Sequence, residues 1–251
     1  MLTVKTFSCG PDEIRLFVVG RIFTNCYAYI SRGECLVIDV GATGAEVRDQ
    51  LRDVSIKAVV ATHGHGDHVS GLVDFLGDDQ LAPVDDATAV PAFAEKIAPA
   101  DGATAAEKTA RAGKIPFLMH KNDIHLAQKP TAPGYFPEDT LAPLPSATIA
   151  DGDVLSVGTA QFRVIETPGH SSGAVCFAGQ RTAGGIVFTG DTLFAGSAGR
   201  TDFEDGNFDV LMSSLNRLKQ ELPPVTIVCP GHDDITTMER ELASNPFYLN
   251  F

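Results

Sequence analysis

The sequence lacks the features that would assign it to a membrane or to a secretory route. No run of apolar residues reaches the roughly 18 that a membrane-spanning helix needs. The opening segment, MLTVKTFSCGPDE, has one lysine and no apolar stretch long enough for a signal peptide. We therefore expect a cytoplasmic protein with no membrane partner.

Paired cysteines are also missing. The five cysteines are odd in number and widely spaced, and none of them forms a Cys-x-x-Cys pair. This pattern argues against a disulfide framework and against a cysteine zinc site. Cys35, Cys176 and Cys229 lie in apolar runs, which favours small buried side chains over reactive thiols.

Basic charge is scarce, because 19 lysines and arginines face 32 aspartates and glutamates, for a net charge of -13. The field of such a chain repels polyanions, so we expect a small-molecule substrate and no nucleic-acid partner. The oligomeric state stays open. With 251 residues, of which 44% are hydrophobic, the chain can bury a core without disulfides or metal.

Two successive β-then-α halves organise the chain. In the first half, strand-like runs lie at 3–7, 16–19, 27–30, 35–40 and 56–62. Helical stretches lie at 45–51 and in a short segment that ends near Leu76. The second half repeats this plan, with strands at 154–157, 162–167, 174–178, 186–189 and 225–229, a helix at 208–222 and a final short helix. This order predicts an α+β fold, with two sheets packed on each other and helices outside.

The composition changes between residues 78 and 113, which are rich in alanine and interrupted by Pro83, Pro91 and Pro99. We interpret this stretch as an insertion into a single domain that spans residues 1–251. It could be a surface excursion, a dimer contact or a lid over a functional site.

The strongest chemical signal follows the strand predicted at 56–62. There the sequence reads His63-Gly64-His65-Gly66-Asp67-His68, with three imidazoles and one carboxylate separated by glycines. Glycine lets the backbone turn sharply, so that such ligands can converge on a small volume. Imidazole binds zinc, iron and related metals, and a carboxylate adds the negative charge that holds a dication.

Three further candidate ligands each follow a predicted strand. They are His170 in TPGHSSG, Asp191 in TGDT and His232 in CPGHD. A sheet can present side chains at the ends of its strands toward one common edge. Together with the histidine-rich turn, four strand ends therefore deliver histidine or aspartate.

The ordered set HGHGDH, GH at 170, GD at 191 and GH at 232 resembles the metallo-β-lactamase superfamily. Asn25-Cys26-Tyr27 and VIDVG at 37–41 are similar to its early strands. Within it, TGDTLFAGSAGRTDFEDGNFDVLMSSL and VCPGHDDITTMERELASNPF are similar to small glyoxalase II-like hydrolases. The resemblance covers nearly the whole chain apart from 78–113. It implies a four-layer αβ/βα sandwich with a binuclear metal site, without the C-terminal helical domain of long glyoxalase II enzymes.

The resemblance also implies the roles of the ligands. It assigns a first metal to His63, His65 and His170, a second metal to Asp67, His68 and His232, and a bridging position to Asp191. Three histidines leave an open metal position, as catalysis requires. Zinc is the favoured metal, and the ligands are also compatible with iron and manganese.

The implied reaction is hydrolysis of a thioester by a hydroxide shared between two metals. Asp67 is a further candidate to orient that hydroxide. Phe194 and Arg200 are candidates to bind substrate, where Arg200 could hold a carboxylate or form a structural salt bridge. Three hydroxyl residues beside the ligands could support them, namely Thr62, Ser171 and Thr192. His120 and His125 lie outside the matched set and are interpreted as ordinary imidazoles at the surface or core edge.

Other functions on the same scaffold remain alternatives. A persulfide dioxygenase with a single iron shares a stretch like GRTDF at 199–203, but the intact Asp67, His68 and His232 favour a second metal. Lactone hydrolysis would use the same site. True β-lactamases are disfavoured because many carry cysteine where Asp191 stands, and flavodiiron proteins because they typically carry glutamate where His65 stands. RNA-processing members are disfavoured by the acidic charge, and a non-catalytic sensor by the complete ligand set.

Overall fold

The computed structural model describes residues 2–77, 114–129 and 141–249. Within them, strands form a seven-stranded sheet in the order β1-β2-β3-β4-β5-β6-β7 and a six-stranded sheet in the order β15-β14-β11-β10-β9-β8. A small sheet pairs β12 with β13. The insertion predicted at 78–113 lies outside the described residues.

The seven-stranded sheet is antiparallel from β1 to β4 and parallel from β4 to β7. Its strands are β1 (Thr3–Cys9), β2 (Asp12–Val19), β3 (Thr24–Ser31), β4 (Glu34–Ile38), β5 (Ser55–Val60), β6 (Phe117–His120) and β7 (Ala147–Ile149). The six-stranded sheet is antiparallel except where β11 and β14 run parallel. Its strands are β8 (Val154–Val157), β9 (Ala160–Glu166), β10 (Val175–Arg181), β11 (Ile186–Gly190), β14 (Ile227–Pro230) and β15 (Thr236–Thr237), and the small sheet has β12 (Leu193–Phe194) and β13 (Ser197–Ala198).

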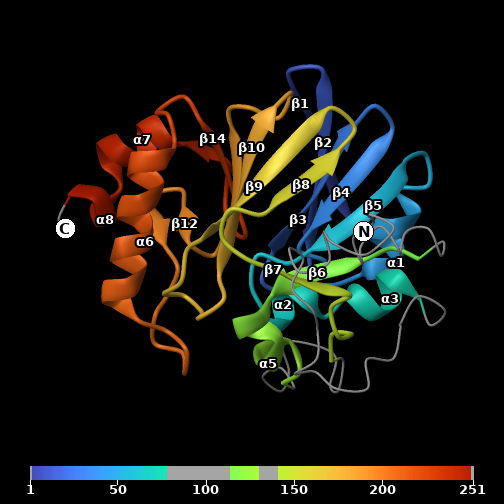
Figure 1. Ribbon diagram of the computed structural model, residues 1–251, viewed down its shortest axis with the longest axis horizontal. Coiled ribbons are helices and arrows are strands. Elements are labelled where there is room, and N and C mark those ends of the chain that lie inside the picture. The colour runs from blue at the N-terminus through green and yellow to red at the C-terminus, as the bar shows by residue number, and fades with distance from the viewer. Residues whose placement is uncertain (1, 78–113, 130–140, 250–251) are drawn as a thin grey trace, which may run out of the picture.

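Helices flank both sheets on their outer sides (Figure 1). Those beside the seven-stranded sheet are α1 (Gly44–Asp49), α2 (Gly66–Val69), α3 (Leu72–Leu76), the 3-10 turn η4 (Lys121–Asp123) and α5 (Ile124–Ala127). Those beside the six-stranded sheet are α6 (Phe208–Glu221), α7 (Met238–Ser244) and α8 (Pro246–Leu249). In the described residues, no helix has the length and apolar character that crossing a membrane requires.

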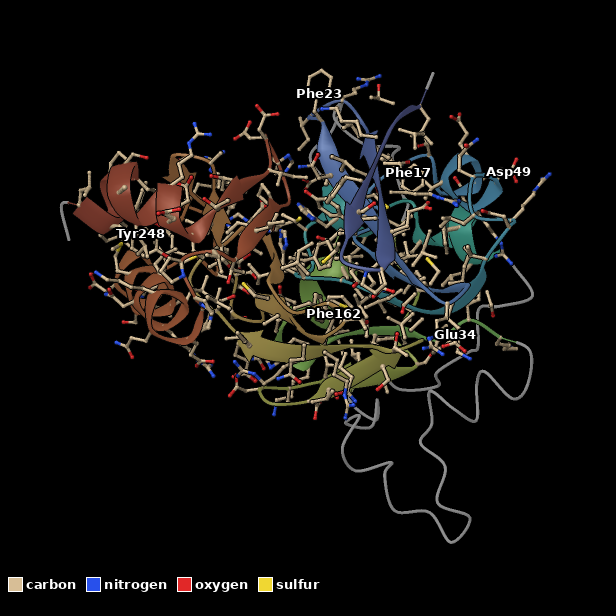
Figure 2. The ribbon with its side chains drawn as sticks, turned by 90° about the horizontal axis from the view of Figure 1, so that it is seen from above. Phe17, Phe23, Glu34, Asp49, Phe162 and Tyr248 are labelled. Carbon is tan, nitrogen blue, oxygen red and sulfur yellow. The ribbon has the colours of Figure 1, made fainter. Side chains whose placement is uncertain are left out.

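Apolar side chains of the described residues gather in three buried clusters that correspond to the three interfaces between layers. Strand alternation sorts them, because successive side chains point to opposite faces. In β3, Tyr27 and Tyr29 face the other sheet, whereas Cys26 and Ala28 join the cluster toward the helices. Phe162, labelled in Figure 2, meets Tyr29 edge-on between the sheets, with ring centroids 4.8 Å apart. The predicted α+β sandwich is therefore confirmed.

All five cysteines are free and buried, as their apolar surroundings predict. Burial raises the pKa of the Cys35 thiol to about 12 and that of Cys176 to about 11. Both thiols are therefore protonated near neutral pH and suit packing rather than nucleophilic chemistry.

The sequence analysis missed five strands of the described residues, namely β6, β7, β12, β13 and β15. β6 and β7 are short and pair only with distant parallel partners, so no local hairpin signal marks them. β12, β13 and β15 have two residues each, which is too short for a periodic pattern. The strand predicted at 225–229 begins later, at Ile227, because the chain before it turns, with the Thr226 N–H donating to the Pro223 carbonyl at 3.0 Å. The helix predicted at 208–222 ends one residue earlier, at Glu221.

Candidate metal centre

The structure brings all seven candidate ligands together. His63 and His65 follow β5, and Asp67 and His68 lie on the first turns of α2. The other three follow strands of the opposite sheet, with His170 after β9, Asp191 after β11 and His232 after β14. The centre therefore lies where strand ends of both sheets meet, as the sequence pattern indicates.

Three overlapping groups of ligand atoms could each hold a metal ion, and the atoms within each group lie within 4.8 Å of one another. One group is His63, His65 and His170, another is Asp67, His68 and His232, and the third is His63, His68 and Asp191. The first two match the two metal positions that the sequence resemblance implies.

Asp191 lies between the two groups. One of its oxygens, Oδ1, is 3.3 Å from His68 Nε2, and the other, Oδ2, is 3.5 Å from His170 Nε2 and 3.6 Å from His232 Nε2. A carboxylate in this position can give one oxygen to each of two cations.

Polar atoms in the cluster lack partners. His63 Nε2, His68 Nε2 and Asp191 Oδ1 are buried and form no hydrogen bond within the described structure. An unsatisfied buried polar atom costs about 1–3 kcal/mol, so each such atom in a native protein calls for an explanation. A divalent cation bound by these atoms supplies that explanation, and the residues present therefore fit a metal.

The pKa values of the histidines point the same way. Burial, reinforced by neighbouring imidazoles, holds the pKa of His63 well below its usual value and lowers that of His65 to about 4. Both rings are therefore neutral at pH 7, which is the form that binds a metal. Burial also acts against the charge on His68, but Asp67, Asp191 and Asp39 outweigh it and raise the pKa of His68 well above its usual value. The three carboxylates thus stabilise a positive charge at the centre.

Hydrogen bonds at Nδ1 orient three of the rings. His170 Nδ1 donates to the carbonyl of Arg200 at 2.7 Å, His232 Nδ1 to the carbonyl of Ile22 at 3.2 Å, and His68 Nδ1 to Asp39 Oδ2 at 2.9 Å. A carbonyl oxygen can only accept, so in His170 and His232 a proton stays on Nδ1 and Nε2 faces the centre, where a bound metal would take its lone pair.

Asp39 supports the centre although the sequence analysis did not single it out as a site residue. Its carboxylate accepts hydrogen bonds from the Thr62 backbone N–H and the Thr62 hydroxyl, both at 2.7 Å, as well as from His68. Thr62 Oγ1 in turn lies 3.2 Å from His63 Nδ1. Asp39 is fully buried and has a left-handed φ of 59°, a conformation that persists where the surroundings impose it.

We expect Asp39→Asn to weaken metal binding by about 10- to 100-fold, the usual effect of changing a partner of a ligating histidine. The amide places an N–H donor where Thr62 or His68 already donates. Competition with a metal-sensitive dye measures the change in affinity. Asp49→Asn is the matched control, because Asp49 lies on the outer surface (Figure 2) and pairs with Arg52. Equal affinity in Asp39→Asn and Asp49→Asn would refute the supporting role.

Asp123 is a second supporting residue that the sequence did not reveal. It is fully buried and accepts hydrogen bonds from Gly64 N at 2.9 Å, from Ser171 Oγ at 2.6 Å and from Gly173 N. Burial raises the pKa of its carboxyl group. Asp123 thereby ties the loop that carries His63 and His65 to the loop that carries His170.

The remaining candidates divide into those near the centre and those away from it. Ser171 acts through Asp123, whereas the Thr192 hydroxyl bonds Thr167 at 2.9 Å. His120 pairs with Glu166 at 3.0 Å and His125 with Asp205 at 2.9 Å. Neither histidine belongs to the three groups, which fits their interpretation as bystanders.

A cavity of about 800 Å³ opens above the centre. Both substrate candidates line it, and the ring centroid of Phe194 is 6.0 Å from that of His232. The guanidinium of Arg200 is engaged elsewhere, since it forms two hydrogen bonds of 2.6 Å to Asp202 and lies 4.3 Å from the ring centre of Phe203. Phe203 also lines the cavity, and the sequence analysis did not propose it as a site residue.

Comparison with known proteins places these features in a family. The model described as "Metallo-beta-lactamase superfamily" matches residues 19–232. The probable metallo-hydrolase YqgX of Bacillus subtilis is 27% identical, over 94% of this chain and 98% of that protein. A hydroxyacylglutathione hydrolase of Cereibacter sphaeroides is 30% identical, over 80% of this chain and 58% of that protein.

Two solved structures are similar over nearly their full length. The BLEG-1 B3 metallo-beta-lactamase has a TM-score of 0.71 at 26% identity, covering 94% of this chain and 99% of its own. TTHA1623, in a di-iron-bound form, has a TM-score of 0.65 at 27% identity, covering 92% of this chain and 98% of its own.

Proposed function

This chain belongs to the metallo-beta-lactamase superfamily, whose members are in general metal-dependent hydrolases, and we propose that it hydrolyses thioesters with two divalent metal ions. The observation that carries the proposal is the convergence of seven histidine and aspartate side chains in two groups joined by Asp191. The similarity to a hydroxyacylglutathione hydrolase supports a thioester as substrate.

In this proposal His63, His65 and His170 would hold one ion, Asp67, His68 and His232 would hold the other, and Asp191 would be a ligand of both. When bound, two divalent cations supply a Lewis acid for the carbonyl oxygen and lower the pKa of water toward neutrality. Hydrolysis then breaks the carbon–sulfur bond, with the water oxygen going to the acyl carbon and a proton to the thiol.

Asp67 has a second role in the proposal. Its Oδ2 accepts from Thr24 Oγ1 at 3.1 Å and lies 3.0 Å from His232 Nε2 and 3.2 Å from His68 Nε2. The other oxygen of the carboxylate is then available to accept a hydrogen bond from water. His68 and His232 counter the effect of burial and hold the pKa of Asp67 well below its usual value, so the carboxylate is ionised when it acts.

The metal is proposed to be zinc. Iron is the main competitor, because the similar TTHA1623 was solved with two iron ions. Manganese is also compatible with a histidine and carboxylate ligand set.

The proposal also includes a small-molecule partner and a cytoplasmic location. A net charge of -13 supports a small-molecule substrate over nucleic acid. Five free cysteines suit a reducing compartment such as the cytoplasm. A single domain that includes the insertion at 78–113 also remains part of the proposal.

A substrate panel on the metal-loaded protein tests the proposed reaction. We expect acyl-thioesters to be hydrolysed faster than lactones and β-lactams, with release of free thiol. The β-lactam belongs in the panel because BLEG-1 is a metallo-beta-lactamase. Oxygen uptake with glutathione persulfide is measured in parallel. Oxygen consumption without thioester hydrolysis would overturn the proposal in favour of a persulfide dioxygenase.

A further inference from the structure

Apolar side chains surround the cavity above the metal centre without serving the core. Ile22, Phe194 and Phe203 all line it. Ile22 is 37% exposed and Phe203 41% exposed. None of the three belongs to the buried clusters formed by the described residues. Exposed apolar surface of this kind, gathered at a concave site, is typical of ligand binding.

The rings of Phe203 and Phe194 each pack against histidines of a different candidate metal group. The ring centroid of Phe203 is 5.0 Å from that of His65 and 5.9 Å from that of His170. Phe194 lies against His232, with centroids 6.0 Å apart. A substrate whose carbonyl reaches the metal centre would therefore lie beside an aromatic ring, whichever of the two groups it approaches.

Away from the metal centre, the cavity offers little positive charge to an anionic group. Among the described residues, Arg200 is the only lysine or arginine that lines it. Asp202 engages the Arg200 guanidinium through two hydrogen bonds, and Phe203 covers one of its faces. Asp233 adds a further carboxylate to the lining. A carboxylate on the substrate would share the Arg200 guanidinium with Asp202 and would lie near the carboxylate of Asp233.

We propose that this cavity selects an uncharged, apolar acyl group, which packs against Phe203 and Phe194. The inference rests on the proposed thioester hydrolysis and names its substrate class: thioesters of branched alkyl or aromatic acids rather than of dicarboxylic acids. The cavity volume of about 800 Å³ lies within the usual range for small-molecule sites. Each buried methylene contributes about a fourfold gain in binding.

The test compares two thioesters of N-acetylcysteamine that differ mainly in charge. 4-Methylpentanoyl and succinyl groups have similar shapes, but only succinyl carries a carboxylate. We expect kcat/KM for the 4-methylpentanoyl thioester to exceed that for the succinyl thioester by about 10-fold or more, since each of the two methyl groups in place of the carboxylate oxygens gains about fourfold from apolar contact. Equal values, or a preference for succinyl that Arg200→Ala removes, would overturn the inference.

Variants of the two rings make the test specific. Phe203→Ala and Phe194→Ala should each lower kcat/KM for the 4-methylpentanoyl thioester about 10-fold or more, since each removes apolar contact area. The acetyl thioester, which barely reaches the rings, should change less than about threefold. Val225→Ala is the control, because Val225 is 75% exposed and is not among the residues lining the cavity. A uniform loss on both substrates would contradict a role in acyl selection.

Binding of uncleavable thioethers separates this inference from the reaction itself. S-(4-methylpentyl)- and S-(3-carboxypropyl)-N-acetylcysteamine are titrated into the metal-loaded protein by calorimetry. We expect the alkyl thioether to bind at least about 10-fold more tightly, and Phe203→Ala to remove the difference. Selective binding without any thioester cleavage would refute the proposed reaction alone. Cleavage without selectivity for either pair of compounds would refute the apolar acyl site alone.

Discussion

Asp191→Ala is expected to reduce thioester hydrolysis by about 1,000-fold or more and to lower the metal content of the purified protein. The two oxygens of this carboxylate face His68 on one side and His170 on the other. In the proposed centre, its loss would remove a ligand from both metal positions. Lewis-acid stabilisation by a metal contributes several kcal/mol to the transition state, which corresponds to that loss in rate.

Metal analysis and kinetics on the same preparation distinguish this effect from unfolding. Circular dichroism should report an unchanged fold, because Asp191 lies at a strand end rather than in a buried apolar cluster. Asp49→Ala is the control, since Asp49 is largely exposed on α1 and pairs with Arg52. Wild-type metal content and rate in Asp191→Ala would refute the bridging assignment.

Gly41→Ala is expected to destabilise the protein and displace α2, although Gly41 is not a candidate ligand. A Cβ at this position would lie 1.6 Å from the carbonyl oxygen of Asp67 and 2.7 Å from its carbonyl carbon. The obstacle is backbone, so it cannot move aside as a flexible side chain would. Relief requires the segment after β4 to separate from α2, which carries Asp67 and His68.

We expect this substitution to cost about 3 kcal/mol or more in the free energy of unfolding, at the upper end for overpacking. That corresponds to a melting temperature lower by about 6–12 °C for a chain of this size. Metal affinity should fall together with stability. Gly184→Ala is the control, because its Cβ would meet only the Arg181 carbonyl oxygen, at 3.1 Å. Equal melting temperatures for the two variants would contradict the close approach of the two segments.

Much of the fold could be predicted because many strands and helices have a recognisable pattern of apolar residues within their own sequence. Strands such as β2, β3 and β9 have alternating or continuous apolar patterns, and α6 has Leu211, Leu215 and Leu218 at helical spacing. β6 and β7 could not be found in this way. Each is held by parallel pairing with a strand far away in sequence, and a run of three or four residues has no reliable periodicity.

The residues of the candidate site also differ in how far they could be predicted from sequence. The candidate ligands could be identified because each histidine or aspartate follows a strand in a short glycine-containing motif. Asp39 and Asp123 were not identified as supports, because their partners are 23 to 59 residues away in sequence. Arg200 was considered both as a carboxylate binder and as part of a salt bridge. The structure has the salt bridge, with Asp202 two residues along the chain.

The most direct test of the account is the metal stoichiometry of the full chain, measured by elemental analysis alongside thioester hydrolysis. We expect two divalent ions per chain, loss of hydrolysis when a chelator removes them, and recovery when zinc is returned. A single iron per chain with oxygen consumption, or hydrolysis that survives complete removal of metal, would contradict it.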